Sequence, residues 1–127
     1  MNFLCLVYFE QGTLSALSPD EKASLDRDSM AYDEELRRSG HYIVANALEP
    51  AGTARTVRVR RGKASATDGP FAETKEHLGG FILIDAANLN EAVDIAAGIP
   101  LAKLGSIEVR PIMELGQGPV KNTDPLH

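Results

Sequence analysis

Residues 68–80 bring together the side chains of this chain that could most readily do chemistry. The carboxylates of Asp68 and Glu73 lie close in sequence to the amine of Lys75, and the imidazole of His77 follows two residues later. Opposite charges close together keep each other ionised, while burial can move the pKa of a carboxyl group toward neutral pH. A group tuned in this way can act as a general acid or base. These four residues are therefore the candidate catalytic residues.

The same stretch also carries a strong turn signal. Asp68 can accept hydrogen bonds from backbone amides, Gly69 tolerates a positive φ, and Pro70 fixes its own φ. Phe71 is expected to pin this turn into the core. Phe71 and Arg58 are also the candidate substrate-binding residues. The alternative is a purely structural turn, in which Lys75 is a solvated loop charge and His77 is a surface or interface histidine.

The sequence offers little for a metal or a cofactor, and neither is expected. Glu73 and His77 are four residues apart, but no second His or Cys pair completes a zinc-like set. Gly79-Gly80 matches no phosphate-binding loop. Cys5 stands alone in an apolar run and is best interpreted as a small buried hydrophobe. His41 opens a strand next to a helix terminus, where a structural role is expected.

Bulk composition limits the classes of partner and location. The formal net charge is −5 and the pI is about 5.1, which argues against nucleic-acid binding. No apolar run approaches the roughly 20 residues that span a membrane, so no membrane partner is expected. The chain begins without a basic leader or a small-residue cleavage site. A cytoplasmic location is therefore expected.

Residue patterns predict alternating strands and helices. Continuous or alternating apolar residues predict strands over 2–9, 41–48, 55–60, 63–67, 80–86 and 106–113. Ser18 and Glu21 form a capping-box signal for a helix that runs to Arg38, and a shorter helix is predicted between Asn88 and Gly98. In the strand 55–60, valines alternate with arginines, which predicts one buried face and one exposed face.

This order of elements predicts an α+β fold with two helices on one face of an antiparallel sheet. The ferredoxin-like sandwich is the simplest fit, with one domain over residues 1–115 and a mobile tail over 116–127. The other face of the sheet would be bare and apolar. Since a bare apolar face of that area usually finds a partner, a homodimer packed sheet to sheet is expected.

Residues 68–76 read DGPFAETKE, and the chain resembles the DGPF family of the YCII-related domain superfamily. The words Glu34-Glu35-Leu36-Arg37, Thr56-Val57-Arg58, Gly79-Gly80-Phe81 and Glu108-Val109-Arg110-Pro111 extend the resemblance over about residues 1–115. The resemblance implies a ferredoxin-like fold that dimerises into a barrel-like assembly. It also implies a cleft near the dimer interface, lined partly by this motif.

The resemblance leaves two functions open. Related YCII-like proteins resemble small-molecule enzymes that use a His/Asp pair with the His on or near the first helix, but residues 18–38 contain no His, so that pair is not carried over. The first hypothesis is a small-molecule enzyme that does acid/base chemistry in a dimer-interface cleft. DGPF proteins are also often encoded beside, or fused to, extracytoplasmic-function sigma factors. The second hypothesis is accordingly a non-catalytic ligand-sensing or protein-interaction dimer that serves a sigma factor.

Overall fold

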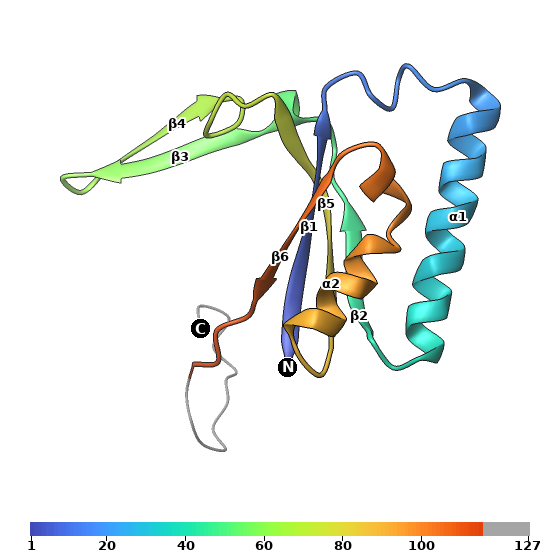
Figure 1. Cartoon of the computed structure of the whole chain (residues 1–127). Coiled ribbons are helices and arrows are strands. Elements are labelled where there is room, and N and C mark those ends of the chain that lie inside the picture. The colour runs from blue at the N-terminus through green and yellow to red at the C-terminus, as the bar shows by residue number, and fades with distance from the viewer. Residues whose placement is uncertain (116–127) are drawn as a thin grey trace.

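The computed structural model describes residues 1–115, which form two helices on one face of a sheet and a separate hairpin (Figure 1). The predicted tail, 116–127, lies outside the described residues. The strands and helices follow the predicted order: β1 (Asn2–Glu10), α1 (Pro19–Arg38), β2 (Tyr42–Ala47), β3 (Arg55–Arg60), β4 (Lys63–Asp68), β5 (Glu76–Asp85), α2 (Leu89–Ala97) and β6 (Ser106–Pro111). Short 3-10 helices, η1 (Ala51–Thr53) and η2 (Pro100–Lys103), lie in two of the connections.

The main sheet has four strands in the order β2-β5-β1-β6, and every neighbouring pair is antiparallel. Strands β3 and β4 pair only with each other and form a second, two-stranded sheet. Figure 1 shows this hairpin projecting from one end of the main sheet, on the side away from α1 and α2. The predicted α+β fold is confirmed, and the strand order is consistent with a ferredoxin-like arrangement.

Strand β5 begins earlier than the sequence indicates. It starts at Glu76 rather than Gly80, because β1 continues to Glu10 and pairs with these additional residues. The register shifts between Val7 and Tyr8, where β5 accommodates one extra residue, Gly79. A β-bulge of this kind bends the strand and re-aims its side chains. As a result, His77 lies on a strand rather than in a loop.

The core lies between the helices and the side chains that alternate along β1 and β5. Phe3, Cys5 and Ile84 are completely buried, and Ala92 and Ile95 of α2 pack in the same cluster. Burial raises the pKa of the Cys5 thiol to about 11. The thiol is therefore protonated at neutral pH, and the interpretation of Cys5 as a buried hydrophobe is confirmed.

Hydrogen bonds fix the start of α1 and join this helix to α2. The predicted capping box is present: the backbone N–H of Glu21 donates to Ser18 Oγ over 3.1 Å, and the backbone N–H of Ser18 donates to Glu21 Oε1 over 2.8 Å. Farther along α1, the Tyr32 hydroxyl donates to the Ile95 carbonyl over 2.6 Å and joins α1 to α2. Gly98 makes this contact possible, since a Cβ there would lie 2.5 Å from the Tyr32 hydroxyl.

Neither helix of the described chain is long and apolar enough to cross a membrane.

The face of the sheet away from the helices, which we call the open face, is apolar at its centre. Register places Leu4 beside Leu83 and Leu6 beside Phe81 on this face. The charged Arg110 and Glu108 of β6 lie opposite Leu4 and Leu6 at one edge. Nothing in residues 1–115 packs over the open face as a second layer. The expected bare face is therefore present, and the homodimer stays a prediction.

Candidate functional site

A cavity of about 920 Å³ lies at the foot of the hairpin, between the β2–β3 connection and residues 70–78. We call it the motif groove. The side chains that give it chemical character are Tyr8, Arg55, Thr56, Phe71, Thr74 and His77. They come from β1, β3, β5 and the β4–β5 connection, so the groove exists only where the hairpin meets the main sheet.

His77 has the most suitable position for chemistry in this groove. It lies on β5 opposite Phe9 and is half-buried. It also lines an adjoining cavity of about 390 Å³, which Phe9 and Leu14 help to form. Within residues 1–115, no side chain or backbone group forms a hydrogen bond with its ring. His41 differs, because its Nδ1 donates to the Asp85 carbonyl over 2.8 Å, which confirms the structural role expected for it.

An ion pair and a hydrogen bond connect the start of β3 to the predicted turn. Arg55 Nε lies 3.0 Å from Asp68 Oδ1, and the Thr56 hydroxyl donates to the Gly69 carbonyl over 2.9 Å. Gly69 has a φ of 95°, so the expected need for glycine at this position is confirmed. The Asp68 side chain is 88% exposed. It therefore orients the guanidinium of Arg55 from outside the groove and does not line it.

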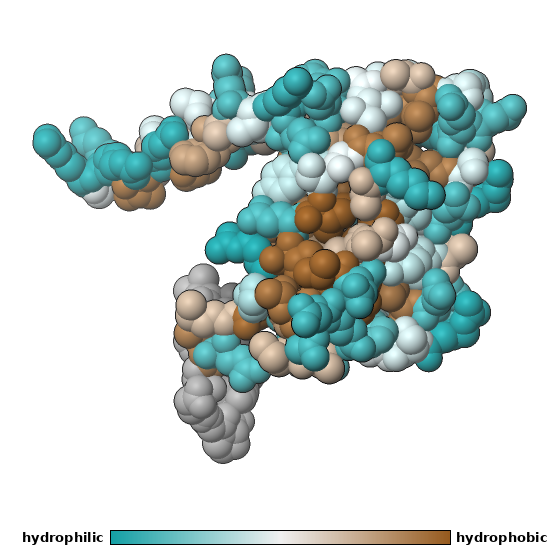
Figure 2. All heavy atoms as spheres, viewed as in Figure 1, coloured by the Kyte–Doolittle hydropathy of each residue, from teal (hydrophilic) through white to brown (hydrophobic). Residues whose placement is uncertain are grey.

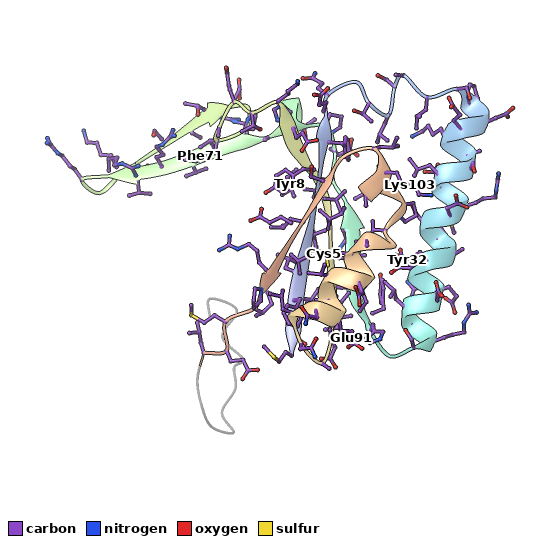
Figure 3. All side chains as sticks on the ribbon, viewed as in Figure 1. Cys5, Tyr8, Tyr32, Phe71, Glu91 and Lys103 are labelled. Carbon is purple, nitrogen blue, oxygen red and sulfur yellow. The ribbon has the colours of Figure 1, made fainter. Side chains whose placement is uncertain are left out.

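Phe71 does not pack in the core, so that expectation was wrong. It is 76% exposed, and the guanidinium of Arg58 lies 5.4 Å from the centre of its ring. Figure 3 shows Phe71 beside the hairpin, far from the side chains around Cys5 and Tyr32. The predicted burial of one hairpin face was wrong too, since Val57 and Val59 are 63% and 60% exposed. The physical reason is the same for both: the hairpin projects beyond the main sheet, and no layer of the described chain covers it.

The other predicted catalytic residues are not gathered in one place. Lys75 Nζ lies 3.4 Å from Glu10 Oε1, and the Lys75 side chain is 87% exposed. Glu73 is exposed and does not line the motif groove. Of the four candidates, the structure places only His77 on the groove wall. Phe71 lines the groove, and Arg58 approaches it through its contact with Phe71.

Two groove residues were missed in the sequence. Tyr8 was interpreted as part of an apolar strand, although it follows Leu4 and Leu6 at the strand period of two and so points to the open face. Arg55 lies opposite Asp68 in the hairpin register. Counting outward from the turn at Arg61-Gly62 would have revealed that pair.

A third cavity lies on the other side of the sheet, under α1. It has a volume of about 340 Å³ and includes Tyr32 and Asp33 of α1 together with Gly79 and Gly80 of β5. Partial burial raises the pKa of Asp33, and the nearby Arg37 opposes that shift. The close pairing of β5 with β2 requires glycine at position 80, since a Cβ there would lie 2.9 Å from the Asn46 carbonyl oxygen.

Residues 1–115 contain no group of three or more His, Cys, Asp or Glu side chains arranged to hold a metal ion. The histidine of the motif groove is accompanied by aromatic, hydroxyl and guanidinium groups. These groups suit an organic ligand better than a metal ion.

Comparisons with known proteins agree with this architecture. The chain is 40% identical over 114 residues to an uncharacterized protein of Rhizobium meliloti (strain 1021), a match that covers 88% of this chain and 92% of the relative. Its fold is similar to that of 5-chloro-2-hydroxyhydroquinone dehydrochlorinase from Burkholderia phenoliruptrix AC1100, solved in complex with 2,5-dihydroxybenzoquinone. The TM-score is 0.55 and the identity 19%, over 89% of this chain and 94% of that one. The model of the YCII-related domain matches residues 1–116, so the chain belongs to the YCII-related domain family.

Proposed function

We propose that this protein is a small-molecule enzyme of the DGPF branch. It binds a planar, oxygen-bearing organic molecule in the motif groove, where His77 transfers a proton. One observation carries the proposal. His77 is half-buried, its ring has no hydrogen bond to any described residue, and it lies between the groove that contains Tyr8, Arg55 and Phe71 and the adjoining cavity that contains Phe9. Histidine titrates near neutral pH and can give or take a proton there.

The groove has parts that would hold such a ligand. Tyr8 and Phe71 supply aromatic faces, against which a planar ring can stack. The Nε of Arg55 forms the ion pair with Asp68, and the remaining N–H groups of its guanidinium can bind an oxyanion of the ligand. The Arg58 guanidinium lies 5.4 Å from the centre of the Phe71 ring, a distance at which a cation attracts an aromatic face. The expected ligand is therefore a hydroxylated aromatic or quinone-type molecule with at least one ionisable oxygen.

The other motif residues have supporting roles in this proposal. Asp68 is a positioning residue that acts through Arg55. Glu73 and Lys75 are exposed charges near the groove. A second copy of the chain, packed on the open face, would narrow the groove and desolvate these charges. Desolvation strengthens electrostatic interactions, so the homodimer would make the site more effective than one chain alone.

The fold comparison supports this ligand class. The dehydrochlorinase that shares the fold was solved with 2,5-dihydroxybenzoquinone, which is planar and carries ionisable oxygens. At 19% identity the likeness concerns the fold. The choice of ligand therefore rests on the aromatic, guanidinium and imidazole groups of the motif groove itself.

A ligand-sensing or protein-interaction dimer, such as a partner of a sigma factor, is the second candidate. The exposed hairpin favours it, since Val57, Val59 and Phe71 are available for a macromolecular contact. The two candidates differ in one observable. The enzyme consumes a bound ligand, whereas the sensor binds it and leaves it unchanged over many binding cycles.

The test is thermal unfolding of the purified protein with 2,5-dihydroxybenzoquinone and a panel of hydroxylated quinones and benzoates. A ligand at about a hundredfold excess over its Kd stabilises the folded state by about 2.7 kcal/mol. For a chain of this size, this should raise Tm by roughly 8 °C or more. We expect Phe71→Ala to lose most of this shift.

Met30→Ala is the matched control, because Met30 is a similarly exposed apolar residue on α1, 72% exposed and outside the groove. It should retain the full shift. A panel without any hit, or an equal shift in Phe71→Ala and the wild type, would contradict binding in the motif groove. The absorbance spectrum shows whether the bound ligand changes chemically. A ligand that binds but stays unchanged would support the ligand-sensing protein over the enzyme.

A further inference from the structure

We infer that the β3–β4 hairpin is an arm that packs against a second copy of this chain. The two faces of the hairpin are chemically different. Register places Val57 beside Ala66 and Val59 beside Ala64 on one face, which we call the apolar arm face, with the Arg55–Asp68 ion pair at its base. The opposite face carries polar and basic side chains, namely Thr56, Arg58, Arg60, Lys63, Ser65 and Thr67. Figure 2 shows apolar side chains exposed along the hairpin.

The hairpin has a defined shape but lacks a supporting layer. Arg61 and Gly62 at its tip both have positive φ values, 54° and 76°. Two such residues form the tight turn that matches the natural twist of a hairpin. However, an isolated two-stranded sheet is at best marginally stable in water. An exposed apolar face on such a sheet therefore indicates a surface that is covered in the functional protein.

Charge favours a second copy as the occupant. Residues 55–68 hold five of the thirteen basic residues of the chain and one of its eighteen acidic residues. The remainder of the chain is correspondingly acidic. A basic arm and an acidic body attract each other over a distance, and this complementarity steers two copies together. A nucleic acid would match the basic side chains but would leave Val57 and Val59 exposed.

The direction of the arm agrees with this occupant. The hairpin projects on the side of the main sheet away from the helices, which is the side of the open face (Figure 1). Two copies that pack through their open faces would each extend an arm along the other. In a two-fold assembly the same contact forms twice. This inference rests on the proposed dimer and adds the element that holds it together.

Ala66 and Ser65 provide a closely matched pair of test positions. They are adjacent small residues on β4, both exposed, and they lie on opposite faces of the hairpin. The experiment is the sedimentation of the full chain at several concentrations, with the variants Ala66→Asp and Ser65→Asp. We expect the wild type to be a dimer. Ala66→Asp should weaken dimerisation by about 100-fold, because it would bury a carboxylate without a partner. Ser65→Asp should retain the dimer.

Different outcomes overturn different statements. A monomeric wild type would overturn the dimer and the arm together. A dimer that survives in Ala66→Asp, or is lost equally in both variants, would overturn only the arm. If the wild type is monomeric and binds nucleic acid, and Ser65→Asp abolishes this binding, the partner of the hairpin is a nucleic acid and not a second copy. Far-UV circular dichroism checks that each variant is folded, and the ligand-induced Tm shift reports on the motif groove, whose lining also includes Val57.

Discussion

Replacing Gly105 by alanine is expected to lower the free energy of unfolding by about 3 kcal/mol or more. A Cβ at this position would lie 2.0 Å from the Tyr8 carbonyl oxygen and 3.0 Å from Cβ of Phe9. The first of these atoms belongs to the backbone of β1 and cannot rotate away. The start of β6, where Ser106 pairs with Tyr8, would have to separate from β1. Urea denaturation, which measures the free energy of unfolding, checks this result.

Gly52→Ala is the control for this substitution. Gly52 lies in η1, its backbone does not have a positive φ, and a Cβ there would have no atom within 4 Å. Its unfolding free energy should change by about 0.5 kcal/mol or less. Equal effects of the two substitutions would show that β6 does not pack against Tyr8 as closely as described.

Replacing His77 by glutamine is expected to lower kcat by about 10²- to 10⁴-fold, the usual contribution of a general acid or base. Glutamine keeps a hydrogen-bonding side chain of similar length but cannot exchange a proton near neutral pH. Binding should change much less than turnover, because Tyr8, Arg55 and Phe71 would still hold the ligand. The measurement is steady-state turnover of a substrate identified by the Tm screen, together with its Kd.

His41→Gln is the matched control, because His41 is also half-buried but uses its Nδ1 to hold the Asp85 carbonyl. This variant should retain turnover and lose some stability. Retained turnover in His77→Gln would exclude His77 as the acid or base.

Much of the fold could be predicted, because local signals agreed with the long-range arrangement. The capping box at Ser18 and Glu21, the continuous apolar run around Cys5 and the turn at Arg61-Gly62 each depend on neighbouring residues. The start of β5 could not be predicted in this way. Glu76 and His77 are polar, and the two glycines after Leu78 resemble a loop. Only pairing with β1, with a bulge between them, makes this segment a strand.

The candidate site was only partly predictable, because closeness in sequence differs from closeness in space. Asp68 ends β4 and turns toward Arg55, while Lys75 reaches Glu10 on another strand. Whether Phe71 was buried depended on where the hairpin extends, which no local pattern specifies. Tyr8 and Arg55, by contrast, joined the groove through strand register and could have been found by counting along paired strands.

The most direct test of the proposed site is NMR of the histidine ring nitrogens in ¹⁵N-labelled protein, titrated with the ligand that gives the largest Tm shift. The expected result is a change in the ring signals of His77, because the ligand would contact the imidazole. The ring signals of His41, which is engaged with Asp85, should stay unchanged. A ligand that stabilises the protein while the His77 ring signals stay the same would contradict the motif groove as the ligand site.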